Sequence, residues 1–381
     1  MNAIIKKYDD TYALWFQQSK SFLLLKEPAF MVFTMLQKRM ARSEIVEFCQ
    51  KKYGRIEPKT EQFTDEIISL LNHYNSAKEN HAPSRKELPD NSIKAAAITD
   101  SYVYRIGQKN IRINYGHKNL VHAIHPLQAH LVIDYTDEVE HTIDCFVTEN
   151  LLICKYNGEL IEAFRTEDIE YFTGNVRQLQ YSILYNKHFY DWMGMLHASG
   201  VEQNNRAILF SAAAGSGKTT ISALLKANGY GFLGDDFIAV DKEGNAYPFP
   251  AAISVKSGSV DVLSPFYPEL KTSAAEQTFI GKTVHYVPVN STDKNTSHNF
   301  PAKAFVFVQY SADCSFSFHP VEKPEALQQL LKETWVNPQE KYVRSFFDWV
   351  EQTTFYSLKY ADTADALTAI ESLSKEFKSE T

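Results

Sequence analysis

The sequence of 381 residues is poor in cysteine and carries no large excess of charge of either sign. Its four cysteines, Cys49, Cys145, Cys154 and Cys314, form no C-x-x-C pair, which predicts reduced, mostly buried thiols of an intracellular protein. The formal net charge is −7 at pH 7. A chain with this charge is not expected to attract nucleic acids or membrane surfaces broadly.

Long apolar runs are also missing. No stretch is long enough to span a bilayer, and the first ten residues, MNAIIKKYDD, lack the apolar segment of a signal peptide. We therefore expect a cytoplasmic protein. Hydrophobic residues nevertheless make up 44% of the chain and aromatic residues 13%, which is ample for a packed core. The length predicts two or three domains.

The most informative segment of the chain is residues 212–236, which follow the apolar run 208–210. A short apolar run predicts a buried strand, a small Gly-rich stretch follows, and Lys218-Thr219 begins a predicted helix that Gly229 ends. Glycines let backbone N–H groups turn toward phosphate oxygens, and the helix start adds a favourable dipole. Lys218 can reach the β- and γ-phosphates, and the Thr219 hydroxyl suits Mg²⁺. The predicted nucleotide-binding residues are Ala212, Ala213, Ala214, Gly215, Ser216, Gly217, Lys218, Thr219 and Thr220.

This loop departs from the usual G-x-x-x-x-G-K-[ST] pattern at its first position, where Ala212 replaces glycine. An alanine there requires a backbone angle that a residue with a Cβ can hold. The alternative interpretation is a Gly-rich turn that binds no ligand. The strand–loop–helix context favours the phosphate loop, because that context is what the motif requires.

Two adjacent carboxylates, Asp235 and Asp236, follow the predicted helix and a short, partly aromatic run. If they were buried without a partner, their desolvation would be costly. One of them can hold Mg²⁺, directly or through water, and the other can accept a proton from an attacking hydroxyl. We predict that Asp235 and Thr219 are the metal ligands. A polar turn without function is the alternative.

These residues resemble the HPr kinase/phosphorylase family and its relatives, which share a nucleotide-binding core with PEP carboxykinases. In that family a histidine near a strand start precedes the loop and an aspartate pair follows it, at spacings similar to those of His197, Lys218 and Asp236. The resemblance implies an α/β P-loop core that uses ATP and Mg²⁺. It also implies that Asp236 accepts the proton and that His197 lies beside the transferred phosphate. Lys218 and Thr219 would hold phosphate and Mg²⁺.

A further match is the segment 247–258, a Pro-rich turn that leads into Ser254-x-Lys256. HPr kinase proper has an acidic residue and an arginine at the comparable place, so the chain is more similar to the looser group of HPr-kinase-related proteins. Lys256 is the candidate to stabilise charge on the transferring phosphoryl group. A solvated lysine at a strand end is the alternative. Because this chain lacks that acidic residue, it remains open what replaces the metal ligand that the residue supplies and whether the chain has phosphorylase activity.

Residues 1–78 are predicted to form a small winged-helix-like α+β domain. The apolar run 22–25 predicts a strand, Glu27 opens a helix, Ser43 caps the next helix and Gly54 ends it. This block resembles the PqqD-like domains that recognise leader peptides of ribosomally made peptides. The resemblance implies a peptide bound as an added strand at a sheet edge. DNA binding is a competing interpretation, but the excess of basic residues in this domain is too small to favour it. A packing or dimerisation domain is another alternative.

The remaining chain is predicted to be a linker and a kinase-like domain. Residues 79–97 are polar and contain prolines, which is typical of a linker. We divide residues 98–381 into a β-rich subdomain, 98–175, and a nucleotide-binding core, 176–381. A helix is predicted over residues 176–192.

The sequence thus predicts an ATP- and Mg²⁺-dependent kinase that phosphorylates a Ser/Thr-type hydroxyl of a peptide, in the modification of ribosomal peptides. Two other functions stay open: a kinase of a free amino acid or sugar, and a non-catalytic nucleotide-binding scaffold that delivers a peptide. A peptide substrate or leader peptide is the expected partner of the N-terminal domain. Nucleic acid and membrane are not expected partners, and the sequence leaves open whether the chain forms a homo-oligomer.

Overall fold

A computed structural model shows a mixed α/β protein with several sheets, divided into two compact units. The first unit comprises residues Met1–Asn80 and Val321–Gln352, and the second comprises His81–Pro320 and Thr353–Thr381. Among the residues that the structure describes, no helix is long and apolar enough to cross a bilayer. The described residues are 1–54, 59–76, 97–134, 139–148, 150–213, 215–278, 281–289 and 298–377. The predicted linker therefore lies almost wholly outside them.

The first unit is built on an antiparallel sheet in the order β1-β2-β3 (Ala3–Tyr8, Thr11–Phe16, Ser21–Lys26). The inward side chains of β2 and β3 pack against three helices, α1 (Glu27–Gln37), α2 (Arg42–Tyr53) and α3 (Thr60–Ser76). Strand β3 contains the predicted strand 22–25, and β1 and β2 precede it. The structure corrects the predicted cap, because α2 begins at Arg42 and its N-cap residue is Ala41, not Ser43.

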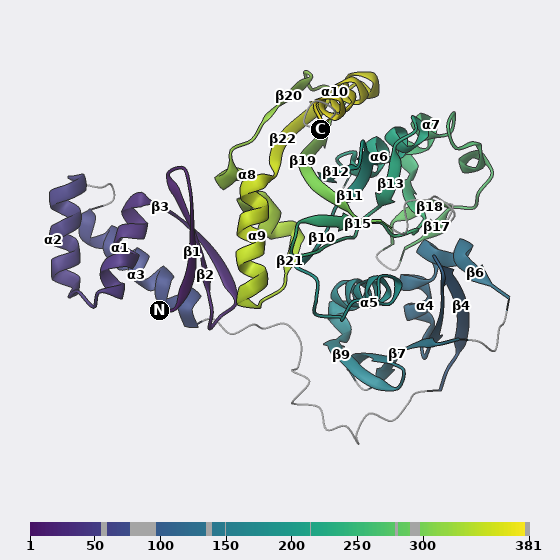
Figure 1. The fold of residues 1–381 in the computed structure, drawn as a ribbon, viewed down its shortest axis with the longest axis horizontal. Helices are drawn as coiled ribbons and strands as arrows, with labels where there is room; N and C mark the ends of the chain where they lie inside the picture. The colour runs from purple at the N-terminus through teal and green to yellow at the C-terminus, as the bar shows by residue number, and fades with distance from the viewer. Residues whose placement is uncertain are drawn as a thin grey trace. The chain divides into compact units, whose positions relative to one another are not determined.

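A segment from late in the chain completes the first unit. It consists of α8 (Lys323–Glu333), β21 (Thr334–Val336) and α9 (Glu340–Gln352). The rings of Phe346 and Phe347 lie 6.0 and 5.9 Å from that of Phe22, and the Tyr8 hydroxyl donates to the Phe347 carbonyl at 2.8 Å. The sequence-based division assigned this segment to the kinase-like domain. The structure differs because the apolar face of α9 packs against β1 and β3. Figure 1 shows α9 next to this sheet.

The second unit begins with a six-stranded sheet in the order β6-β4-β5-β7-β8-β9. Its strands are β4 (Asp100–Ile106), β5 (Lys109–Tyr115), β6 (Val132–Ile133), β7 (His141–Thr148), β8 (Leu151–Tyr156) and β9 (Glu159–Arg165). The dipeptide Asn157-Gly158 predicts a hairpin turn from its sequence, and the φ values of 47° and 86° at these residues confirm that turn between β8 and β9. Helix α5 (Ile169–Leu184) packs against this sheet. It begins and ends earlier than the helix predicted over 176–192, so the expected subdomain boundary falls inside it.

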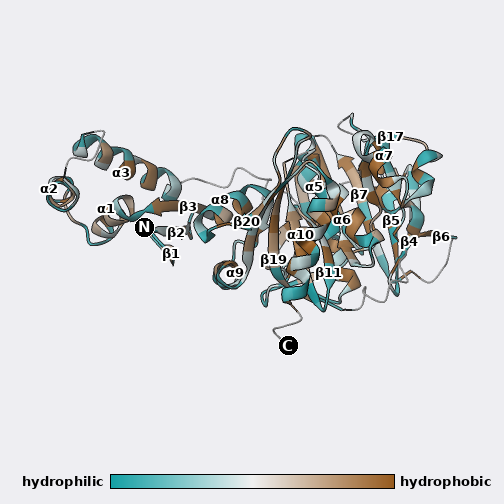
Figure 2. Ribbon diagram, turned by 90° about the horizontal axis from the view of Figure 1, so that it is seen from above, coloured by the Kyte–Doolittle hydropathy of each residue, from teal (hydrophilic) through white to brown (hydrophobic). Residues whose placement is uncertain are grey.

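The core sheet of the second unit contains β13-β11-β12-β19 (Gly231–Gly234, Ser199–Gln203, Arg206–Ser211, Phe300–Tyr310), and β22 (Thr354–Tyr360) pairs with β19. Strands β12, β19 and β22 are parallel. Helices α6 (Lys218–Ala227) and α10 (Thr363–Glu376) cover one face through a shared apolar cluster (Figure 1). Figure 2 shows the long strand β19 largely brown, as expected of a strand in the interior.

Three short strands extend this sheet from the start of β19. They are β15 (Asn245–Tyr247), β14 (Ile238–Val240) and β10 (Gly194–Leu196). A separate small sheet is formed by β16 (Ile253–Lys256), β18 (Thr283–Val287) and β17 (Glu276–Gln277). The turns after β10, β12 and β13 carry His197, the Gly-rich loop and the aspartate pair, respectively.

Candidate functional site

The Gly-rich loop joins β12 to α6, and α6 begins at Lys218 as predicted. In the described part of the loop, the residues with positive φ are Gly215 (87°) and Gly217 (91°), a region that glycine adopts readily. Ala212 has no positive φ, and it packs against the apolar cluster beneath α6 and α10. The missing glycine at the first motif position is therefore compatible with the backbone there. Ala214 lies outside the described residues.

The loop is held against the ends of the two neighbouring parallel strands. The Tyr310 N–H donates to the Ser216 carbonyl at 3.0 Å, and the Tyr360 hydroxyl donates to the Gly217 carbonyl at 3.5 Å. Ser216 in turn donates its N–H to the Ala213 carbonyl at 3.0 Å. A Cβ at Gly217 would overlap the Tyr360 hydroxyl, so only glycine fits this close approach.

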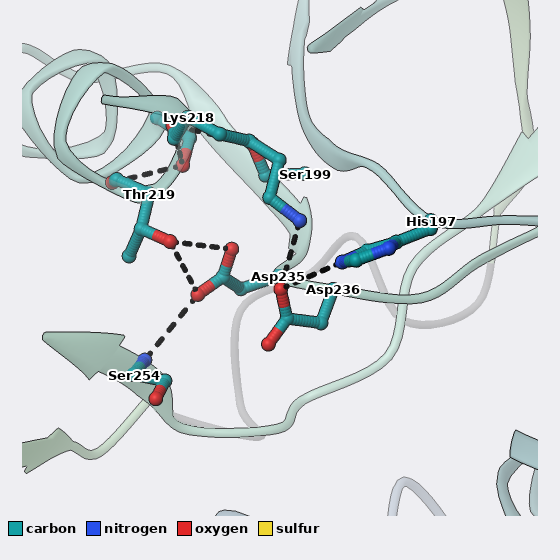
Figure 3. Close-up of polar contacts among 8 residues, drawn as sticks. His197, Ser199, Lys218, Thr219, Asp235, Asp236 and Ser254 are labelled. Carbon is teal, nitrogen blue, oxygen red and sulfur yellow. Dashed lines mark hydrogen bonds and ion pairs between the residues drawn. The ribbon is translucent and has the colours of Figure 1, made fainter. Parts of the chain in front are cut away.

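Lys218 and His197 converge on one oxygen of Asp236 (Figure 3). The Lys218 Nζ lies 2.8 Å from Asp236 Oδ1, and His197 Nε2 lies 3.5 Å from the same atom. His197 sits in the turn between β10 and β11, whereas Lys218 opens α6. The sequence predicted all three residues, and the structure brings them together from three separate segments. Their side chains differ in exposure, because that of Lys218 is 10% exposed and that of Asp236 is 40% exposed.

Asp235 faces the first turn of α6. The Thr219 hydroxyl lies 3.1 Å from each carboxylate oxygen of Asp235, and the Ser254 backbone N–H donates to Oδ2 at 3.3 Å (Figure 3). The contact from Ser254 comes through its backbone, so comparing side-chain types at this position could not reveal it. Ser199 supports the same turn, since its hydroxyl donates to the Lys218 carbonyl at 3.3 Å.

The two carboxyl groups have opposite pKa shifts. Burial, together with the charge of Asp236, raises the pKa of Asp235 to about 6, although Lys218, Thr219 and Ser254 act against this. Burial would also raise the pKa of Asp236, but Lys218 and His197 outweigh it and hold that pKa well below its usual range. Asp236 is therefore ionised throughout the neutral range, whereas Asp235 takes up a proton as the pH falls through about 6. Such divergence between neighbouring acids is frequent at functional sites.

Helix α5 holds the turn that carries the two aspartates. Asp236 has a φ of 71°, a left-handed conformation that costs energy for a residue with a Cβ. The Tyr181 hydroxyl donates to the Phe237 carbonyl at 3.0 Å, and Gly174 leaves room for the Phe237 ring. The sequence did not predict this support. Tyr181 carries no local signal for it, because only the packing of α5 brings it to the turn.

Arg177, on the same helix, is a buried cation near the site. It is 7% exposed, its guanidinium lies 4.1 Å above the centre of the Phe249 ring, and Nη1 has no hydrogen-bond partner among the residues that the structure describes. Burial lowers its pKa to about 10, while tyrosines of the core and Asp236 act in the opposite direction. Arg177 therefore remains charged at neutral pH and adds positive charge to the surroundings of the aspartate pair.

The remaining predicted residues are less closely tied to this centre. The Thr220 hydroxyl lies 2.8 Å from that of Ser259, and Thr220 is 9% exposed. Ala213 is exposed. Lys256 is exposed at the end of β16, two positions after Ser254 and on the same side of the strand. No contact between described residues joins Lys256 to either aspartate.

The donor atoms around Asp235 suit a hard cation. Thr219 and Asp235 offer a hydroxyl and a carboxylate, the oxygen ligands that Mg²⁺ takes when water and phosphate complete its shell. Across the part of the chain that the structure describes, no three His, Cys, Asp or Glu side chains are grouped to hold a metal by themselves. The residues thus fit a cation that is shared with a phosphate ligand.

Comparison with known proteins adds no family to this description. No protein-family model matches the chain, and no curated protein matches it either. The function must therefore be argued from the geometry and charge of the site.

Proposed function

We propose that the chain is an ATP- and Mg²⁺-dependent kinase, related to HPr kinases, that transfers the γ-phosphoryl group to a Ser/Thr-type hydroxyl of a peptide. The observation that carries this proposal is that Lys218 and His197 both contact the Asp236 carboxylate at the N-terminus of α6. Beside them, the Thr219 hydroxyl donates to the Asp235 carboxylate. A helix start behind a Gly-rich loop favours phosphate, and the adjacent acids favour a metal and a proton acceptor.

The charge of the site supports an anionic substrate. Lys218 and Arg177 place two cations beside the aspartate pair, and Lys218 is already paired with Asp236. The N–H groups of the first turn of α6 add partial positive charge. A triphosphate would pair with these positive groups. Bound Mg²⁺ would neutralise part of the charge that develops on its β- and γ-phosphates.

Lys218 links phosphate binding to proton transfer in this proposal. In the structure its ammonium pairs with Asp236, which keeps that carboxylate ionised but weakly basic. Lys218 can turn from Asp236 to the phosphates, and the pKa of Asp236 then rises because it loses its strongest partner. Asp236 thereby becomes a better acceptor for the hydroxyl proton when the donor is in place. His197 remains beside Asp236 to orient it.

The first unit is the proposed peptide-binding module. Its three-stranded sheet has two edge strands, β1 and β3, and an extended peptide can add to such an edge through main-chain hydrogen bonds. This is the role that the resemblance to PqqD-like domains implies. We place the reaction in the cytoplasm, where ATP is available and where the four free cysteines would stay reduced.

The test is transfer of label from γ-labelled ATP, in the presence of Mg²⁺, to Ser/Thr-containing peptides, free serine and sugars. The proposal expects labelled peptide with the wild-type chain and none with Asp236→Asn or Lys218→Met. Lys242→Met is the matched control, since Lys242 is 63% exposed and pairs with Glu243 away from the site. Label on serine or a sugar would favour the small-molecule kinase instead. Nucleotide binding without any transfer would favour the scaffold.

A further inference from the structure

Tyr310 is an exposed aromatic residue next to the Gly-rich loop. It ends β19, it is 45% exposed, and its N–H donates to the Ser216 carbonyl. A Cβ at Gly217 would lie 3.1 Å from the Cβ of Tyr310, so the loop and this side chain start side by side. Single exposed aromatic side chains are common on protein surfaces, so the position of Tyr310 beside the Gly-rich loop carries the argument, and not its exposure alone.

The order of strands places Tyr310 on the side of the loop away from the aspartates. The sheet runs β13-β11-β12-β19, with β22 on the far side of β19, and the aspartate pair follows β13. Ser211, the last residue of β12, pairs with Phe307, so β19 continues past it to Tyr310 beside the loop. Ligands of α/β sheets lie outside the carboxyl ends of the parallel strands, which is where Tyr310 stands.

We infer that Tyr310 is the stacking platform for the base of a purine nucleoside triphosphate, an inference that rests on the proposed function. A triphosphate with its terminal phosphate at Asp236 crosses the loop, and its base end lies on the side where β19 and β22 end. The base is planar and uncharged, and aromatic stacking is the interaction that Tyr310 can offer it. Stacking contacts the face of the base, which is similar in adenine and guanine, and makes no hydrogen bonds to its edges. We therefore expect ATP and GTP to bind with similar affinity.

The buried side chain of Tyr360 packs against the ring of Tyr310. It is 1% exposed, its ring centre lies 5.5 Å from that of Tyr310 at an angle of 59°, and its hydroxyl contacts the Gly217 carbonyl. The two tyrosines are paired in register at the ends of β19 and β22. One tyrosine is therefore anchored in the core while the other presents its ring to solvent, an arrangement that orders an exposed side chain before a ligand arrives.

The test measures the dissociation constants of ATP, GTP and inorganic tripolyphosphate, each with Mg²⁺, by titration calorimetry. Tyr310→Ala should weaken ATP and GTP binding by about 5- to 150-fold, the range for loss of one base stack. Binding of tripolyphosphate, which has no base, should change by less than about 2-fold. Tyr310→Phe should bind all three ligands like the wild type. Phe266→Ala, at an aromatic residue that is 49% exposed elsewhere, is the matched control and should also change nothing.

The outcomes separate this inference from the proposed function. If the wild type binds ATP and Tyr310→Ala binds it equally well, the base lies elsewhere and only the inference fails. An equal loss of ATP and tripolyphosphate binding in Tyr310→Ala would assign Tyr310 to the shape of the loop, which also overturns it. If the folded wild type binds neither ATP nor tripolyphosphate, the proposed function and the inference fall together. A strong preference for ATP over GTP would refute recognition by stacking alone.

Discussion

Replacing Asp235 with asparagine should stabilise the protein at neutral pH. Asp235 is 6% exposed, and burial together with the charge of Asp236 raises the pKa of its carboxyl from 3.8 to about 6. The folded chain therefore holds a buried negative charge above that pH, at a cost in stability. Active-site acids commonly reduce stability in this way, because function requires a charge that folding disfavours.

The sign and size of the effect follow from the two pKa values. The folded state binds the proton of Asp235 more tightly than the unfolded state, so protonation stabilises the fold at low pH, and this contribution is lost as pH rises through about 6. The difference of about two pKa units corresponds to about 3 kcal/mol, of which roughly 1–1.5 kcal/mol is lost between pH 5 and 7. Asp236 does not interfere in this window, because its lowered pKa changes stability only at more acidic pH.

Asparagine at position 235 can still accept from the Ser254 N–H, but it cannot ionise. A poorer hydrogen bond to Thr219 costs about 1 kcal/mol, so the variant should be about 1–2 kcal/mol more stable than the wild type at pH 7.5. We expect urea denaturation to show this gap shrinking by about 1 kcal/mol at pH 5. Transfer activity should be lost, since the proposed metal ligand is gone.

A matched control is Asp241→Asn, at an aspartate that is 3% exposed and accepts hydrogen bonds from Asn245 and Tyr247. This variant should lose stability, because it disrupts a satisfied network and relieves no repulsion. Parallel stability–pH curves for the wild type and Asp235→Asn between pH 5 and 7.5 would refute the reasoning, as they would mean that Asp235 has an ordinary pKa.

Three further predictions follow from other contacts. Gly217→Ala should cost about 2–4 kcal/mol in urea denaturation, because of its positive φ and because the new Cβ would overlap the Tyr360 hydroxyl. Gly215→Ala should cost only about 1–2 kcal/mol, because a Cβ there would meet no atom of the described residues within 4 Å beyond its chain neighbours. Equal losses would argue against the overlap. Tyr181→Phe removes the hydrogen bond to the Phe237 carbonyl, so transfer activity should fall with a stability loss of about 1 kcal/mol, and unchanged activity would count against α5 as the support of the turn. Phe347→Ala should cost about 3–5 kcal/mol and increase hydrogen exchange in β1 to β3, and no change there would contradict the packing of α9 on this sheet.

Local patterns in the sequence were enough to predict the elements around the loop. The strand before the loop, the helix that starts at Lys218, and the hairpin turn at Asn157-Gly158 all lie where they were expected. Each of these signals is carried by neighbouring residues, through apolar spacing or through glycine at a positive φ. The helix over 176–192 was misplaced because its run of aromatic residues continues past the end of α5 at Leu184.

The sequence by itself determined which residue types are available for the site, namely His197, Lys218, Thr219 and the two aspartates. Tertiary structure decided how they are used. Only the folded sheets bring the Ser254 backbone to Asp235, place Tyr181 under the aspartate turn and set Tyr310 beside the loop. Only the packing of α9 assigns residues 321–352 to the first unit. These contacts join residues far apart in the chain, and they depend on strand order and on which apolar faces meet, neither of which a local pattern encodes.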